Sequence, residues 1–291
     1  MKPSTMRRLE PMLRWLKRQQ YKPVVGPLIR ACKPLLQRRT NVVSLGRASG
    51  LRINPGGGRV AYALGIAEPL VQDALAENVR AGDVVWDVGA NIGFFTLIAA
   101  RLAGPEGRVV SFEPMPSNAE ALRANLAANQ ADNVEVVELA ISDSEGTAEL
   151  QVYDDPGWAK LDTTADTAYK SGRQVSSLVT VGLSTLDRQL DAHPHPSLLK
   201  IDIEGGEVAA LRGARRLLSE CRPVVMCELH GTNEAICELL EAEGYELSTI
   251  EAAGTHPRSA FWNAHVLALP PGRRQERPNA VQGSGRVHTG P

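Results

Sequence analysis

Residues 84–100 constrain the fold of this chain more than any other stretch, because they read as a strand, a glycine turn and a helix. The apolar, β-branched-rich run at residues 84–88 suits a strand that is covered on both faces. Gly89 and Gly93 permit a sharp turn and a close approach of the backbone to a ligand. The helix that follows should end near Gly104, which precedes a proline. A ligand held at this turn would lie against the amides of the helix start.

An acidic residue follows the glycine turn at the sequence spacing that is typical of nucleotide-binding folds. Glu113 ends a second predicted strand at residues 108–112, 24 residues after Gly89. In nucleotide-binding α/β folds, a carboxylate about 20 residues past the glycines accepts hydrogen bonds from the ribose hydroxyls. The turn lacks the middle glycine of GxGxxG and has Asn91 there, so a strand–helix corner that uses glycine only for packing stays an alternative. Asp87, Asn91 and Glu113 together favour a ligand site.

The rest of the chain alternates between strand and helix patterns. This alternation predicts an α/β fold with a mostly parallel sheet and helices on both faces. We expect strands at residues 134–139, 147–152, 178–181, 198–203, 224–229, 245–250 and 264–269, and helices at residues 68–80, 117–129, 184–190, 205–218 and 234–243.

Two stretches are expected to flank the site. Short strands at residues 42–45, 51–54 and 59–64 are predicted to form a lip beside it. The polar segment 153–177 is long for a connection within a compact domain, which suggests a substrate cover.

Polar side chains gather where the predicted strands end. Parallel sheets bind ligands at the carboxyl ends of their strands, near the point where the strand order reverses. The residues at these ends are Asp87, Glu113, Asp202 and Glu228, and those just beyond them are Asn91, Glu204 and His230. We therefore expect one polar site along this edge of the sheet.

Charge is distributed unevenly along the chain. The net charge is −1, but residues 1–40 carry eleven Lys and Arg and one acid, so the remainder is about −11. An acidic body argues against a nucleic-acid-binding main surface. No apolar run approaches the ~18–20 residues of a membrane span. The four cysteines form no CxxC pair and no zinc spacing with the histidines, which is typical of reduced thiols in a cytoplasmic protein.

Three regions are predicted from these patterns. Residues 1–41 form a basic N-terminal extension, residues 42–270 the folded domain, and residues 271–291 a disordered tail rich in Gly, Pro and Arg. The extension is either a segment that contacts a membrane surface or a partner, or a solvated stretch packed on the domain. The oligomeric state is left open.

The order of three motifs resembles a known family. GANIG at residues 89–93, FEP at 112–114 and KIDIEG at 200–205 resemble the FkbM family of S-adenosylmethionine-dependent methyltransferases, with similarity over roughly residues 60–250. The resemblance implies a class I methyltransferase fold, which is Rossmann-like with a seven-stranded sheet, and S-adenosylmethionine as the cofactor. It also implies a small-molecule or glycan hydroxyl as the acceptor.

The resemblance also assigns cofactor contacts by position. It places the cofactor loop at Asp87, Gly89, Asn91 and Gly93, the ribose acceptor at Glu113, and the adenine contact at Asp143 with Ser142 or Ile141 beside it. Asp202 would face the methionine end of the cofactor or the reacting centre.

Transfer of a methyl group to a hydroxyl requires removal of a proton that is held about as firmly as in water (pKa ~15.7), so a base or a metal is expected. The candidate catalytic residues are Asp202, Glu204, Glu228 and His230. His230 has the best-matched ordinary pKa. The carboxylates could instead hold a divalent cation, although no firm metal set is visible and we expect activity to survive a chelator.

The most favoured function is therefore O-methylation of a sugar or natural product. The alternatives are an N-methyltransferase on the same fold, a nicotinamide-dependent oxidoreductase, and a noncatalytic binding module.

Overall fold

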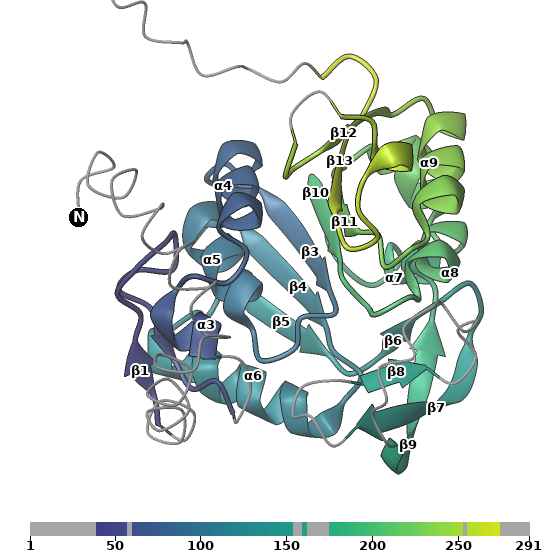
Figure 1. Cartoon of the computed structure of the whole chain (residues 1–291). Helices are drawn as coiled ribbons and strands as arrows, with labels where there is room; N and C mark the ends of the chain where they lie inside the picture. The colour runs from purple at the N-terminus through teal and green to yellow at the C-terminus, as the bar shows by residue number, and fades with distance from the viewer. Residues whose placement is uncertain (1–38, 57–59, 154–158, 162–174, 253–254, 274–291) are drawn as a thin grey trace, which may run out of the picture.

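The computed structural model describes residues 39–56, 60–153, 159–161, 175–252 and 255–273 (Figure 1). Almost all of the predicted extension (1–41) and tail (271–291) lies outside these residues, as does most of the predicted cover at 153–177. The boundaries at 41/42 and 270/271 therefore stay predictions.

A seven-stranded sheet forms the centre of the fold, in the order β12-β13-β11-β10-β3-β4-β5. Every neighbouring pair is parallel except the two made by β13, which runs antiparallel to β11 and β12. The strands are β3 (Val84–Val88), β4 (Arg108–Phe112), β5 (Val134–Val137), β10 (Leu198–Ile201), β11 (Val224–Glu228), β12 (Glu246–Thr249) and β13 (His265–Leu269). This confirms the predicted α/β fold with a mostly parallel, seven-stranded sheet.

The strand order reverses at β3. From β3 the chain adds β4 and β5 on one side, and β10 and β11 on the other. The register aligns Val88 at the end of β3 with Phe112 of β4 and Ile201 of β10. The turns after these strands therefore meet at one edge, which is where open α/β sheets bind ligands.

Helices cover both faces of the sheet (Figure 1). Because side chains alternate along a strand, Val85 packs in the core under one layer and Trp86 in the core under the other. The first layer contains α4 (Pro69–Asn78), α5 (Phe94–Ala103) and α6 (Pro116–Asn129), and the second contains α7 (Leu186–Gln189), α8 (Glu207–Arg212) and α9 (Asn233–Ala242).

A second sheet has four strands in the order β6-β9-β7-β8 and is drawn at the lower right of Figure 1. It contains the strands predicted at residues 147–152 and 178–181, which lie within β7 and β9 and pair antiparallel. Its strands are β6 (Ala140–Ile141), β7 (Gly146–Tyr153), β8 (Ala159–Leu161) and β9 (Val175–Ser184).

Two predicted elements are wrong. Residues 59–64 were expected to form a strand, but the structure has helix α3 at Val60–Leu64. Five apolar residues are too few to separate a strand period from a helical one. The helix expected at 205–218 is broken, because α8 ends at Arg212 and a π-helical turn follows at Leu217–Cys221. The other two strands of the predicted lip shrink to β1 (Asn41–Val42) and β2 (Arg52–Ile53).

No helix in the described ranges is both long and apolar enough to span a bilayer. Within the same ranges, Cys221, Cys227 and Cys237 are free thiols, as predicted.

Candidate active site

The glycine turn after β3 fits tightly between two neighbouring segments. Gly89 has φ +84°, and a Cβ there would lie 1.9 Å from the backbone oxygen of Asp202. Gly93 has φ +88°, and a Cβ there would lie 2.2 Å from Leu122 Cδ1 of α6. Packing alone therefore requires glycine at position 89, where the neighbour is backbone, whereas at position 93 the positive φ is the stronger reason for glycine. The same packing brings the turn against the end of β10, beside Asp202.

Glu113 fastens this turn to the end of β4. Its Oε2 accepts a 2.7 Å hydrogen bond from the backbone N–H of Asn91, and its Oε1 accepts one of 3.0 Å from Met115. Asn91 adopts a left-handed conformation (φ 51°) that asparagine tolerates better than most residues. Burial raises the pKa of Glu113 to about 7, against the lowering effect of these hydrogen bonds. Glu113 therefore holds the turn in place, and its role as the ribose acceptor stays a prediction.

Asp87 forms a buried ion pair instead of facing the edge of the sheet. It is 1% exposed, its Oδ2 accepts from Thr96 Oγ1 at 2.6 Å, and its Oδ1 lies 3.3 Å from Lys200 Nζ. Lys200 Nζ also lies 3.8 Å from Asp202 Oδ2. Burial would lower the pKa of Lys200, but Asp87 and Asp202 raise it above its ordinary range. Asp87 therefore positions Lys200 and the start of the turn.

Four acids and one imidazole meet beyond β10 and β11, and we call them the acid–histidine cluster. His230 Nε2 lies 3.3 Å from Glu204 Oε2 and 3.5 Å from Glu228 Oε1, and its Nδ1 lies 2.9 Å from Glu207 Oε1. Asp202 shares a hydrogen bond with Glu228. The cluster thus contains all four candidate catalytic residues, Asp202, Glu204, Glu228 and His230, together with Glu207.

The pKa values in the acid–histidine cluster are strongly displaced. Burial and the charge of Asp202 raise the pKa of Glu228 to about 10. Burial would raise that of Asp202 too, but Lys200 and His230 lower it. Burial would lower the pKa of His230, but the hydrogen bond to Glu207 and the acids around it raise it to about 10. A pKa of about 10 leaves His230 charged at neutral pH, which differs from the neutral base that its ordinary pKa suggested.

Backbone strain accompanies the acid–histidine cluster. Glu204 has φ 55° and His230 has φ 42°, both in the left-handed region that side chains disfavour. Because β10 ends at Ile201, Glu204 reaches His230 through this turn and not as part of the strand. Strained residues of this kind concentrate at functional sites.

Sequence reasoning missed four residues around the acid–histidine cluster. Glu207 is fully buried and accepts hydrogen bonds from the backbone N–H groups of Ile203 and Gly205 at 3.1 Å each. The other three residues are Glu68, Glu251 and His265.

The missed histidine lies next to Glu228. His265 Nδ1 lies 2.6 Å from Glu251 Oε1, and its Nε2 lies 3.7 Å from both Glu68 Oε2 and Glu228 Oε2. The direction of β13 was the missing signal, since an antiparallel strand places its first residue at this edge. No pattern in the sequence singled out Glu68.

Ser142 and Asp143 form a separate pair after β6. Ser142 is 8% exposed, and its Oγ lies 3.5 Å from Asp143 Oδ1. A Cβ on Gly213 would lie 2.3 Å from the Ser142 backbone oxygen, so this corner packs against the end of α8. Their adenine contact stays a prediction.

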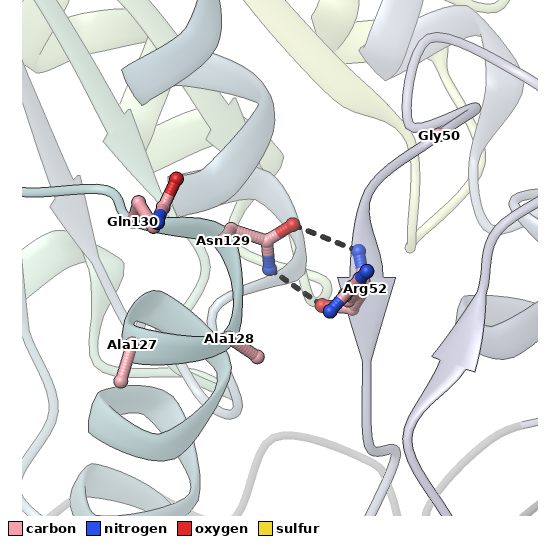
Figure 2. Close-up of a pocket in the computed structure, with 6 residues that line it drawn as sticks. All are labelled: Gly50, Arg52, Ala127, Ala128, Asn129 and Gln130. Carbon is pink, nitrogen blue, oxygen red and sulfur yellow. Dashed lines mark hydrogen bonds between the residues drawn. The ribbon is translucent and has the colours of Figure 1, made fainter.

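A pocket elsewhere on the domain is structural (Figure 2). It is lined by Gly50, Arg52 and residues 127–130, and Asn129 exchanges hydrogen bonds of 2.8 and 2.6 Å with the backbone of Arg52. The pocket lies at the end of α6, a 14-residue helix about 21 Å long that starts just after Glu113. It is therefore remote from the carboxyl edge of the sheet.

Comparison with known proteins identifies a matching family. Residues 87–249, more than half of the chain, match the family model described as the Methyltransferase FkbM domain. This stretch runs from β3 to β12 and includes the glycine turn, Glu113 and the acid–histidine cluster.

Three relatives give the range of similarity. The AMB antimetabolite synthetase AmbE of Pseudomonas aeruginosa is 31% identical over 245 residues, which cover 67% of this chain and 11% of that protein. The 31-O-demethyl-FK506 methyltransferase FkbM of Streptomyces tacrolimicus is 44% identical over 78 residues, 27% of this chain and 29% of that protein. The hexuronic acid methyltransferase AglP of Haloferax volcanii is 27% identical over 158 residues, 54% of this chain and 59% of that protein. The chain thus spans less than two thirds of each of these relatives.

Proposed function

Because this chain belongs to the FkbM methyltransferase family, whose cofactor is S-adenosylmethionine, we propose that it methylates a hydroxyl oxygen on a sugar or natural product. The observation that carries the proposal is the acid–histidine cluster beside the glycine turn. A hydroxyl acceptor must lose a proton, and this edge concentrates the groups that could receive it.

The residues present fit the cofactor. Glu113 offers a carboxylate for the ribose hydroxyls next to the amide of Asn91. The surplus of carboxylates around Asp202 suits a ligand that carries a positive charge. When bound, S-adenosylmethionine supplies a methyl group on a cationic sulfur, which is already activated for displacement. The main task of the protein is then alignment, which can contribute ~7–11 kcal/mol.

Asp202 is the proposed proton acceptor. Its backbone oxygen packs against Gly89, so it adjoins both the cofactor turn and the acid–histidine cluster. Its side chain is 23% exposed and reachable by an acceptor, whereas that of Asp87 is 2% exposed. Glu204 and Glu228, with side chains 26% and 16% exposed, would hydrogen-bond the acceptor beside it.

Two exposed aromatic residues support a ring-shaped acceptor. Phe261 is 84% exposed and Trp262 is 47% exposed. The Trp262 ring lies 6.5 Å from that of His230, and its backbone oxygen accepts a 2.7 Å hydrogen bond from Gly231. An aromatic face at the edge of the acid–histidine cluster suits stacking with a sugar or macrocycle. The names of FkbM and AglP describe a 31-O-demethyl-FK506 and a hexuronic acid methyltransferase, which is compatible with such acceptors.

Two measurements test the proposal. Calorimetric titration with S-adenosylhomocysteine should show micromolar binding, and titration with NAD should show none. Methyl transfer from labelled S-adenosylmethionine should then occur with hexuronates, hexoses or macrolide alcohols, and NMR should locate the methyl group on oxygen. Binding of NAD instead would overturn the reaction class. Methylation of amino sugars on nitrogen, with the alcohols inert, would overturn the acceptor assignment.

A further inference from the structure

We propose that the acid–histidine cluster binds a divalent metal cation, with Asp202, Glu228 and His230 as its protein ligands. One ligand atom from each of these residues lies within 4.8 Å of the others. The proposal rests on the proposed function for the role of the ion, but the binding itself can be measured without any methyl transfer.

The distances in the acid–histidine cluster suit one ion. Metal–ligand bonds of ~2.0–2.2 Å place two ligands of the same ion roughly 3–4 Å apart. His230 Nε2 lies 3.5 Å from Glu228 Oε1 and 3.3 Å from Glu204 Oε2. Glu204 is therefore near enough to supply a fourth ligand.

The orientation of His230 is that of a metal ligand. Its Nδ1 lies 2.9 Å from Glu207 Oε1, so the Nδ1–H donates to this carboxylate and Nε2 faces the acid–histidine cluster. Glu207 is itself held by two backbone N–H groups, those of Ile203 and Gly205. Carboxylates that orient a ligating histidine in this way are typical of metal sites.

An independent observation comes from His265. Its Nδ1 is engaged by Glu251 Oε1 at 2.6 Å, and its Nε2 is buried and has no hydrogen-bond partner in the described part of the chain. His265 is 6% exposed, and its Nε2 faces Glu228 Oε2 from 3.7 Å. A buried polar nitrogen without a partner is costly. Glu228 thus has one oxygen toward each of two histidines that present Nε2 to it.

The local charge balance also favours a cation. Seven carboxyl groups face three basic side chains here, so even with Glu228 protonated and all three basic groups charged, three negative charges remain in excess. Buried like charges of this density are stabilised by a counter-ion. The acids are Glu68, Asp87, Asp202, Glu204, Glu207, Glu228 and Glu251, and the cations are Lys200, His230 and His265.

The ligand chemistry defines the kind of ion and its use. Carboxylates with one imidazole suit Mn²⁺ or another first-row divalent ion better than Ca²⁺, which prefers oxygen ligands alone. A cation here would polarise the acceptor hydroxyl and ease its deprotonation. Asp202 could bind the ion through one oxygen and receive the proton on the other. This departs from our sequence-based expectation that a chelator leaves activity intact.

The test is metal binding by the full-length protein after removal of metals with EDTA and dialysis. We would titrate MnCl₂ and follow free Mn²⁺ by electron paramagnetic resonance. The wild type and the control Glu238→Gln, an exposed acid on α9, should bind about one ion with micromolar affinity. Glu228→Gln and His230→Gln should bind at least tenfold more weakly, with circular dichroism and melting curves confirming that they fold.

Absence of Mn²⁺ binding at millimolar concentration, or equal binding by all four proteins, would overturn the site. S-adenosylhomocysteine titration separates this result from failure of the proposed function. If Mn²⁺ does not bind but S-adenosylhomocysteine still binds and methyl transfer continues in EDTA, the metal site is wrong and the proposed function stands. Loss of cofactor binding both with and without Mn²⁺ would overturn the methyltransferase assignment.

Discussion

At the scale of single residues, two acids at the ends of strands have different surroundings and therefore different expected roles. Glu113 is 5% exposed and is surrounded by hydrogen-bond donors from the glycine turn and α6. Asp202 is partly exposed and is surrounded by charged groups: Lys200, Glu228 and His230. The first environment suits neutral hydroxyls of a ligand, and the second suits proton transfer.

The ribose assignment predicts that Glu113→Ala weakens cofactor binding. A hydrogen bond to a charged group contributes about 1.5–3 kcal/mol, so loss of the carboxylate should raise the Kd for S-adenosylhomocysteine by roughly 10- to 100-fold. Calorimetry measures this change, and Glu120→Ala, an exposed acid on α6, is the control. An unchanged Kd in Glu113→Ala would exclude the role.

The base assignment predicts that Asp202→Ala abolishes turnover. General base catalysis contributes roughly 10²- to 10⁴-fold, and kcat should fall by this factor or more. Transfer of a radiolabelled methyl group to whichever hexuronate, hexose or macrolide alcohol proves to be an acceptor measures kcat. Asp132→Ala, at an exposed position, is the control. Near-wild-type activity in the Asp202 variant would show that another group accepts the proton.

At the scale of secondary-structure elements, the glycine turn joins three elements in one contact region. Gly89 packs on the end of β10, and Gly93 packs on α6. Glu113, at the end of β4, accepts a hydrogen bond from the backbone N–H of Asn91 in the turn. The position of the turn is thus coupled to the position of Asp202. A change that displaces the turn should disturb cofactor binding and stability together.

Gly89→Ala should be far more destabilising than Gly104→Ala. Both glycines have positive φ, and Gly104 (φ 69°, ψ −177°) lies in a region that is essentially confined to glycine, so this backbone strain costs a side chain about 1–3 kcal/mol. A Cβ at Gly104 would meet no atom within 4 Å, whereas one at Gly89 would overlap the Asp202 backbone oxygen. Overpacking adds about 1–3 kcal/mol, so urea unfolding should show a loss of roughly 2–6 kcal/mol for Gly89→Ala and about 1–3 kcal/mol for Gly104→Ala. Equal losses would mean that the turn relaxes freely.

At the scale of the whole molecule, the buried acids couple folding to pH. Glu113 is the simplest case, because its pKa rises from an ordinary 4.5 to about 7 in the folded protein. The folded state then binds this proton more tightly than the unfolded chain. The resulting stabilisation is fully present below pH 4.5 and is lost as the pH rises through 7.

Glu113→Gln should remove this component of the pH dependence. From pH 4.5 to 7 the wild type should lose up to about 3 kcal/mol that the variant does not lose, since one pKa unit corresponds to about 1.4 kcal/mol. Urea unfolding of both proteins at pH 5, 6, 7 and 8 in EDTA provides the comparison. Parallel stability curves for the two proteins would contradict the raised pKa.

Local sequence patterns determined the parts of this protein that depend on neighbours along the chain. The run from β3 through α5 could be predicted because strand and helix periods and glycine stops act within a few residues. The convergence of Asp202, Glu204, Glu228 and His230 followed from the rule that parallel strands end at one edge. That Glu113 would lie beside the glycine turn followed from the same rule.

Tertiary structure alone decided which distant groups complete the site. Helix α3 lies where a strand was predicted. Five residues are too few to show whether the apolar pattern has the period of a helix or of a strand. His265 joined the edge because β13 runs antiparallel to β11, and Glu68, the residue before α4, joined it because its Oε2 lies 3.7 Å from His265 Nε2. The charge on His230 depends on Glu207, because the turn after β10 brings Glu207 Oε1 within 2.9 Å of His230 Nδ1. Electrostatic interactions act through space, so the protonation of these side chains follows from the packing of distant elements and not from their order in the chain.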